Sequence, residues 1–234
     1  MGKKIAVFDF DGTLYPFETF TFLIKQLKKQ KGFQSRYYSF NLQFFTTYAK
    51  YKLKLMPKFM MREKALKTFV RLFKGLTEKE IYSFFEYAYA DMKDRVNNNV
   101  LEELHKLKEQ GYVIVLVSGA VKPLLEIVGR DIPFDIVIGS EIPITSGRFD
   151  EQKEIVYIQG NKKVKELESA LDKYLPDERG TEVEVNWNDS AAYADSQSDL
   201  PVLELVGNPV CVSPEPKLRV IAEERKWRIL EPNC

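Results

Sequence analysis

Histidine and cysteine are scarce in this sequence: one histidine and two cysteines occur among 234 residues. His105 lies in LEELHKLKEQG, whose apolar spacing is that of an amphipathic helix, so we expect a surface or packing role for it. A single histidine excludes most Ser-His-Asp hydrolase schemes and histidine-rich zinc sites. Any chemistry must therefore use carboxylates, lysines and hydroxyls, together with a hard metal ion if one binds.

Disulfides and membrane spans are also not indicated. Cys211 lies inside an apolar run, Cys234 is the last residue, and neither has metal-ligand spacing. No uncharged apolar stretch approaches the length of a membrane span, and the N-terminus runs directly into strand-like sequence rather than a signal peptide. With 44% apolar residues and a net charge of +1, we expect a globular protein of the reducing cytoplasm.

Short apolar runs alternate with helix-like stretches along most of the chain. The runs typical of buried strands are 4–9, 112–117, 134–139, 190–194 and 208–212. The helix-like stretches are 97–110, 121–130, 161–175, 199–206 and 215–225. This alternation predicts an α/β fold with a Rossmann-like parallel sheet and helices on both of its faces. A small hairpin is expected at ITSGRF, residues 144–149.

Residues 15–96 break this alternation. Aromatic and basic residues repeat there at helical spacing, and LTEKEIYSFF carries a helix start, with Thr77 as N-cap and Glu80 three residues later. We predict an all-helical cap domain over 15–96, inserted into a core domain formed by residues 1–14 and 97–234.

Two aspartates, Asp9 and Asp11, end the first apolar run, KIAVFDFDGTLY. Ligands of open parallel sheets bind beyond the carboxyl ends of the strands, and adjacent carboxylates repel unless a cation lies between them. A hard divalent cation such as Mg²⁺ would relieve the repulsion, and Gly12 allows the backbone to approach a ligand closely. An EF-hand calcium loop is excluded, because Thr13 and Phe20 stand where it needs acidic residues.

Further polar residues follow other predicted strands or begin helices. They are Ser118 and Gly119 after YVIVLV, Asp195 and Asp199 around SAAYADSQSDLP, and Lys162 and Lys163 in GNKKV. Each alone has an ordinary explanation as a turn, a helix cap or a surface charge. Asp189 in WNDSAAY is a rival to Asp195, which we prefer because only it has a second aspartate four residues later and a DLP helix start.

Taken in order, these motifs resemble those of the haloacid dehalogenase-like hydrolases. DFDGT matches the first motif, VSG the second, the lysine of GNKKV the third and DSQSD the fourth. The tail from ADSQSDLP to KWRIL, residues 194–230, resembles the branch that includes phosphoserine phosphatase (subfamily IB), in which a helical cap lies between the first two motifs. The resemblance covers about 4–14 and 97–231.

The resemblance implies a role for each motif residue. Asp9 would be the nucleophile that forms an aspartyl-phosphate, and Asp11 the general acid and base. Mg²⁺ would be held by Asp9, the backbone carbonyl of Asp11 and Asp195, with Asp199 orienting a bound water or supporting the site. Ser118, the amide of Gly119 and a lysine would hold the phosphate. The spacing Gly160-x-x-Lys163 favours Lys163 over Lys162.

Glu18 follows Asp9 by nine residues, the spacing of the glutamate that contacts the substrate amine in phosphoserine phosphatases. An ungapped alignment places Phe69 where those enzymes have an arginine, and DSQSD departs from their glycine- and asparagine-containing motif. The sequence therefore disfavours phosphoserine and leaves a phosphorylated amine or amino alcohol open.

Lysine and arginine dominate part of the predicted cap. Residues 25–74 contain fourteen of them and a single acid, Glu63, a net charge of +13. This pattern fits an amphipathic helix pair with a solvated basic face, electrostatic steering of anionic substrates, or weak contact with an anionic membrane surface or nucleic acid. We expect no stable nucleic-acid partner, and the sequence does not determine the oligomeric state.

The sequence thus predicts a magnesium-dependent phosphatase that acts on a small phosphorylated metabolite. Two alternatives stay open: a phosphotransferase or mutase with the same aspartyl-phosphate intermediate, and a binding module that uses the basic cap. A complete set of four motifs favours an enzyme over a module that only binds.

Overall fold

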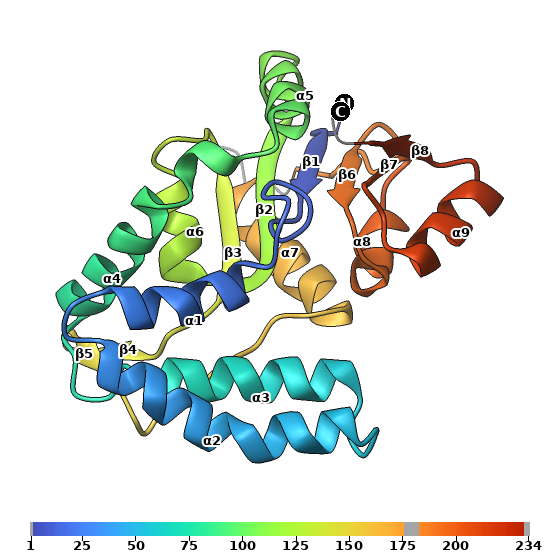
Figure 1. The fold of residues 1–234 in the computed structure, drawn as a ribbon. Helices are drawn as coiled ribbons and strands as arrows, with labels where there is room; N and C mark the ends of the chain where they lie inside the picture. Colours follow the sequence, from blue (N-terminus) through green and yellow to red (C-terminus); the bar gives the residue numbers. More distant parts are fainter. Residues whose placement is uncertain (1, 176–182, 232–234) are drawn as a thin grey trace.

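The computed structural model describes residues 2–175 and 183–231, which form a parallel β-sheet with helices on both faces (Figure 1). The sheet has six strands in the order β3-β2-β1-β6-β7-β8, and every pairing is parallel. The strands are β1 Ile5–Phe8, β2 Val113–Val121, β3 Ile136–Ser140, β6 Ala191–Ala194, β7 Asn208–Val212 and β8 Arg228–Leu230. The predicted α/β class is confirmed, and β8, a three-residue edge strand too short to leave a pattern, was missed.

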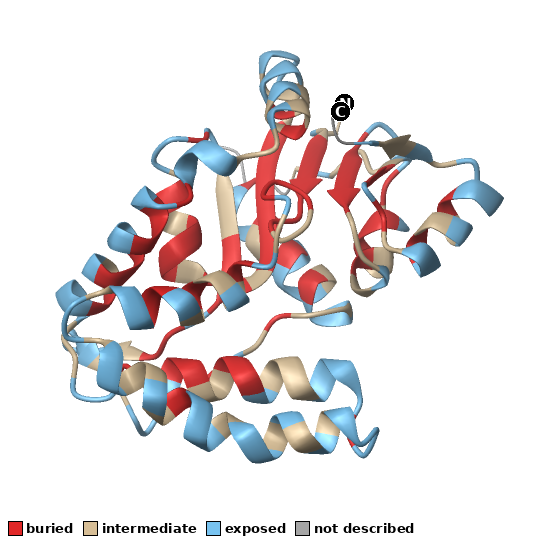
Figure 2. Ribbon diagram, viewed as in Figure 1, coloured by how far each residue is buried: buried red, intermediate tan, exposed pale blue. Residues whose placement is uncertain are grey.

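Side chains that alternate along β1 divide the core into two layers. Ala6 and Phe8 face α5 (Asn98–Glu109) and α6 (Lys122–Val128). Ile5 and Val7 face α7 (Asn161–Tyr174), α8 (Leu200–Leu203) and α9 (Pro216–Glu224). Burial on both faces explains why the central strands are continuous apolar runs (Figure 2).

Four α-helices lie between β1 and α5: α1 Thr19–Lys29, α2 Gln34–Lys52, α3 Lys58–Arg71 and α4 Glu78–Ala90. A short 3₁₀ turn, Lys93–Arg95, follows them. The predicted cap of α4 is present, since Thr77 accepts from the Glu80 amide and the Glu80 side chain accepts from the Thr77 amide. Helices α2 and α3 pack side by side beyond the carboxyl edge of the sheet (Figure 1).

The expected hairpin at 144–149 is present and contacts the start of α4. Strands β4 (Ile144–Thr145) and β5 (Arg148–Phe149) pair antiparallel. The Phe149 amide donates to the Leu76 carbonyl at 3.0 Å, and the Glu78 amide donates to the Gly147 carbonyl at 2.8 Å. This hairpin therefore ties the chain after β3 to the helices before β2.

Phenylalanine rings form the centre of the helical segment. Phe69, Phe73, Phe84 and Phe85 are fully buried, with ring centroids 5.1 to 6.5 Å apart. Their cluster is continuous with the buried side chains on the α5–α6 face of the sheet. The division into a core and a cap domain at residues 14 and 96 stays a prediction.

No helix within 2–175 and 183–231 combines the length and the apolar character needed to cross a bilayer.

Truncation of Phe84 should destabilise the protein strongly. Phe84→Ala would leave a cavity among Phe33, Phe69, Phe73 and Phe85, so we expect a loss of about 3–5 kcal/mol in the free energy of unfolding. Phe45→Ala, at a ring 69% exposed on α2, is the control and should change it by less than about 0.5 kcal/mol. Equal losses in urea unfolding would contradict the assignment of the core.

Candidate active site

Three carboxylates meet where neighbouring strands β1 and β6 end. Asp9 follows β1, Asp195 follows β6, and Asp199 ends the short 3₁₀ helix Gln197–Asp199. One carboxylate oxygen from each lies within 4.8 Å of the others. Because parallel strands bring their carboxyl ends to one edge, residues 186 positions apart in the chain become neighbours.

Lys163 is the cation inside this group. It lies in the first turn of α7, which begins after Gly160, a residue with φ of +57°. Its ammonium donates to Asp9 Oδ1 at 2.6 Å and also pairs with Asp199. The side chain is buried, and its pairing with the two aspartates outweighs burial and raises the pKa of Lys163. Lys162 is exposed and donates to the Tyr157 carbonyl at 3.4 Å.

Negative charge exceeds positive charge at these strand ends. Burial, followed by the neighbouring Asp199, raises the pKa of Asp9 well above its usual range. The same two causes raise the pKa of Asp195 to about 7. Three carboxylates and one ammonium carry a formal charge of −2 when ionised, and their hard oxygen ligands fit a divalent cation such as Mg²⁺.

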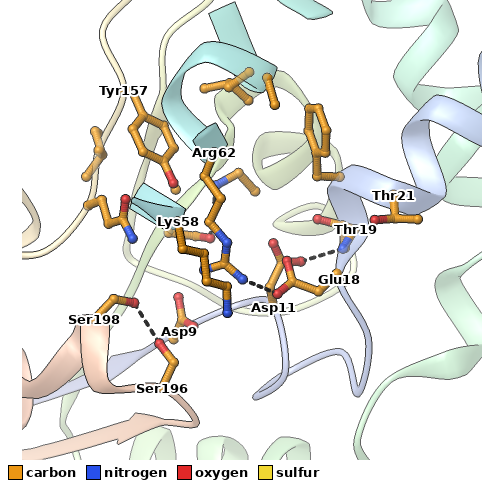
Figure 3. A pocket seen from close by; sticks show the side chains of 18 of the residues that line it. Asp9, Asp11, Glu18, Thr19, Thr21, Lys58, Arg62, Tyr157, Ser196 and Ser198 are labelled. Atoms are coloured by element: carbon orange, nitrogen blue, oxygen red, sulfur yellow. Dashed lines mark hydrogen bonds and ion pairs between the residues drawn. The ribbon is translucent and has the colours of Figure 1, made fainter. Parts of the chain in front are cut away.

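Asp11 lies apart from this carboxylate cluster. Its Oδ1 accepts from the Thr19 amide at 2.8 Å, at the start of α1. Figure 3 shows its side chain beside Glu18, on the side of the cavity toward α1. Burial raises the pKa of Asp11 to about 6, although the hydrogen bond from Thr19 opposes the shift. Among the described residues, the acidic group that could hold a metal contains Asp9, Asp195 and Asp199 but not the Asp11 carboxylate.

Gly12 allows Asp195 to approach the first motif. Its φ is +77°, and a Cβ at this position would lie 2.2 Å from Asp195 Oδ2. Any side chain would therefore both strain the backbone and displace Asp195.

Ser118 and Gly119 lie on β2, in a part of the strand that the sequence did not predict. The run expected at 112–117 continues to Val121, with a register shift between Val117 and Val121. The Ser118 hydroxyl accepts from the Ala120 amide at 3.1 Å. Helix α6 begins at Lys122, three residues beyond Gly119, rather than at 121 as expected.

Ser140 fixes the part of β2 that carries Ser118 and Gly119, and the sequence did not predict this role. Its hydroxyl donates to the Gly119 carbonyl at 2.8 Å and accepts from the Ile158 amide at 3.1 Å. It ends β3, so the argument from strand ends could have found it.

A cavity of about 430 Å³ lies over these groups, between the sheet edge and α3. The cavity is lined by the polar residues Asp9, Asp11, Glu18, Ser118, Lys163, Asp195 and Asp199 and by the apolar residues Phe20, Leu23, Phe44, Met61, Leu66 and Val121, among others. Lys58 and Arg62 extend from α3 toward Asp9 and Asp11, and Arg62 pairs with Glu18 (Figure 3).

The positions that the sequence left open are now placed. Phe69 is fully buried against Phe20, Phe73 and Phe84 and does not line the cavity. Arg62, which the sequence did not single out among fourteen cap cations, is the arginine beside Glu18. Asp189 is exposed and bonded to Asn186, away from the carboxylate cluster.

Comparison with known families gives a match over most of the chain. The model of the family described as haloacid dehalogenase-like hydrolase matches residues 6–204. The chain belongs to this family. The predicted hydrolase class and the family resemblance are therefore confirmed.

Curated relatives of this haloacid dehalogenase-like hydrolase match over short stretches. The phosphoserine phosphatase SerB1 of Mycobacterium tuberculosis is 44% identical over 45 residues, 19% of this chain and 15% of its own length. The inhibition of morphological differentiation protein of Streptomyces azureus is 33% identical over 135 residues, 56% of this chain and 43% of its own. The chain thus spans less than half of the length of the curated relatives it matches.

Solved structures share the fold over nearly the whole hydrolase. A protein of unknown function from Bordetella pertussis Tohama I has a TM-score of 0.79 at 20% identity, covering 98% of this chain and 99% of its own. A phospho-aspartyl intermediate analogue of phosphoserine phosphatase has a TM-score of 0.60 at 18% identity, covering 100% and 95%.

In this hydrolase, Gly12→Ala should destabilise the fold more than a comparable glycine change elsewhere. Gly147→Ala is the control, because Gly147 has a φ of +73° and no atom within 4 Å of the added Cβ. Strain alone should cost the control about 1–2 kcal/mol, and the collision with Asp195 should add about 1–3 kcal/mol in Gly12→Ala. Equal unfolding free energies for the two variants would contradict the close approach of Asp195.

Proposed function

We propose that this protein is a magnesium-dependent phosphatase that hydrolyses a small phosphate monoester through an aspartyl-phosphate on Asp9. The observation that carries the proposal is the position of Asp9. Its carboxylate lies in a cavity with Asp195 and Asp199 close to it, Lys163 bonded to one oxygen, and Asp11 on the side toward the cap helices. A phosphoserine phosphatase of similar fold has been described as a phospho-aspartyl intermediate analogue, which supports the same route here.

Asp9, Asp195 and the backbone carbonyl of Asp11 would hold Mg²⁺, with Asp199 supporting the site. When bound, the ion would reduce the repulsion between the Asp9 carboxylate and an anionic phosphate and would position both. The cluster of buried carboxylates supports this assignment, because it leaves negative charge that Lys163 alone does not balance.

The reaction that we propose has two steps. A carboxylate oxygen of Asp9 attacks phosphorus, the bond from phosphorus to the ester oxygen breaks, and Asp11 donates a proton to the departing alcohol. Asp11 then accepts a proton from water as that water attacks phosphorus, which releases inorganic phosphate and restores the Asp9 carboxylate. The hydrogen bond from Thr19 to Asp11 Oδ1 fixes the orientation of the acid, leaving Oδ2 for proton transfer.

The phosphate oxygens would be held by groups that the scaffold fixes. We assign the Ser118 hydroxyl, the Gly119 amide and the Lys163 ammonium to this role. Ser140 is a positioning residue, because its hydroxyl donates to the Gly119 carbonyl and accepts from the Ile158 amide, which fixes the end of β2 that carries Ser118 and Gly119. Fixed donors of this kind stabilise charge without reorganising during the reaction.

The alcohol part of the substrate would face the cap helices. Glu18 and Arg62 provide a charged pair near Asp11, and Phe20, Phe44 and Leu66 provide an apolar wall beyond it. A polar group on the alcohol suits the pair, and the wall suits an apolar group, so we propose a small monoester that carries both. Serine has no apolar group that would use this wall.

Asp9→Asn should abolish release of phosphate from p-nitrophenyl phosphate, by at least about 10³-fold in kcat, because an amide oxygen is a poor nucleophile. Asp9→Asn should still fold, since Lys163 keeps its partner Asp199. Wild-type enzyme quenched in acid during turnover should gain the mass of one phosphate on the peptide that contains Asp9. Retained activity in Asp9→Asn, or a phosphate on another residue, would reject the assignment.

The metal assignment is tested by Asp195→Asn, with Asp189→Asn as the control. Both residues lie in the segment that includes β6, but only Asp195 faces the carboxylate cluster. Added Mg²⁺ should raise the melting temperature of the wild type and of Asp189→Asn, and it should have a much smaller effect on Asp195→Asn. A chelator should stop hydrolysis until Mg²⁺ is restored. Chelator-resistant turnover, or equal Mg²⁺ stabilisation of all three proteins, would contradict the metal site.

A further inference from the structure

Large apolar side chains are exposed on α2, on the loop that joins it to α3, and at the start of α3. Leu53, Leu55 and Phe59 surround the α2–α3 connection, which we call the hairpin tip, and Tyr38, Leu42 and Phe45 extend the exposed apolar surface along α2. All six are between 57% and 80% exposed. Figure 2 shows the exposed α2–α3 connection at the end of the helix pair. Scattered apolar residues are common on protein surfaces, but a grouped set on one element indicates an interaction surface.

Helix α2 is apolar on two faces. Tyr38, Leu42 and Phe45 are spaced by four and three residues, which places them on one outward stripe. Phe40 and Phe44 lie on a different face, where their rings stack with centroids 5.2 Å apart and join the core. Packing against the rest of the molecule therefore explains the inner face of α2 and leaves the outward stripe uncovered.

Lysines lie close in sequence to the apolar residues of the hairpin tip. Residues 34–62 contain six lysines and arginines and no acidic residue. Within the described part of the chain, Lys50, Lys52 and Lys54 form no ion pair, whereas Lys29 and Lys74 each bind a carboxylate. The tip thus carries positive charge that the protein itself does not neutralise.

We propose that the hairpin tip docks on the surface of an anionic lipid bilayer. Leucine and phenylalanine side chains would enter the boundary between headgroups and acyl chains, and the unpaired lysines would contact anionic headgroups. Charge complementarity selects the anionic surface. Exposed aliphatic side chains favour a bilayer over nucleic acid, because Leu42, Leu53 and Leu55 gain little from a phosphate backbone or from base stacking.

The helix pair α2–α3 also forms part of the cavity wall. Phe44, Tyr48 and Lys58 line the cavity, and Tyr48 is also partly exposed. Docking would therefore hold the cavity close to the bilayer, where phosphate esters with apolar groups concentrate. The docking proposal itself does not depend on the proposed hydrolysis.

The experiment measures co-sedimentation of the full chain with two kinds of vesicle. One contains only phosphatidylcholine, and the other contains phosphatidylcholine and phosphatidylglycerol in equal parts. Two variants test the two components of the surface: Lys50→Glu with Lys54→Glu for charge, and Leu53→Ser with Leu55→Ser for apolar insertion. The control is Lys217→Glu with Val220→Ser, at an exposed lysine and valine on α9.

We expect the wild type and the α9 control to bind the anionic vesicles, with weaker binding at high salt. Each tip variant should lose at least about tenfold in partition coefficient. All three variants should keep the wild-type rate on p-nitrophenyl phosphate, because none of the altered residues lines the cavity.

Several results would overturn the proposal. These are no binding of the wild type to anionic vesicles, equal binding to both kinds of vesicle, or an equal loss in the α9 control. Self-association that the leucine variant abolishes, without vesicle binding, would assign the tip to a second copy of the chain instead. Failure of hydrolysis in every protein, with vesicle binding intact, would reject the proposed function and leave docking supported.

Discussion

The ammonium of Lys163 lies between two buried aspartates, and the arrangement of the site depends on this interaction. Asp9 and Asp199 both pair with it, and Asp195 adds a third carboxylate close to these two. Buried like charges are costly unless cations neutralise them. The fold therefore keeps an excess of negative charge at the sheet edge. This charge costs folding free energy, and it suits a site that binds a cation.

Backbone constraints in the surrounding fold hold these charged side chains in place. Gly12 admits the Asp195 carboxylate to a space that no Cβ could share, and Gly160 starts the helix that carries Lys163. Ser140 links Gly119, near the end of β2, to the backbone at Ile158. Glu18, at the start of α1, and Lys58 and Arg62, on α3, line the cavity from the opposite side. Acidic groups at the sheet edge and cationic and apolar groups on the facing helices would together suit the substrate that we propose, a phosphate ester with an apolar group.

Local sequence located most of the charged residues at the sheet edge. Asp9 and Asp195 could be placed because the ends of buried parallel strands have clear local patterns, whereas the choice of Lys163 over Lys162 came from the spacing of the resembling family. The extension of β2 and the short edge strand β8 could not, since both depend on pairing with neighbours rather than on composition. Arg62 was hidden among many cap cations, because only helix packing decides which of them faces the cavity. The ungapped alignment pointed to Phe69, which is a buried core residue. Such an alignment does not show which face of a helix turns toward the cavity, because that depends on the elements packed around the helix.

A crystal structure of the protein grown with Mg²⁺ and beryllium fluoride, a phosphoryl mimic that binds aspartate, tests the central claim most directly. We predict the mimic on a carboxylate oxygen of Asp9, with the metal between Asp9 and Asp195 and with Lys163 turned toward the fluorides. A metal bound elsewhere, or an Asp9 that keeps only its contact with Lys163 under these conditions, would contradict the account.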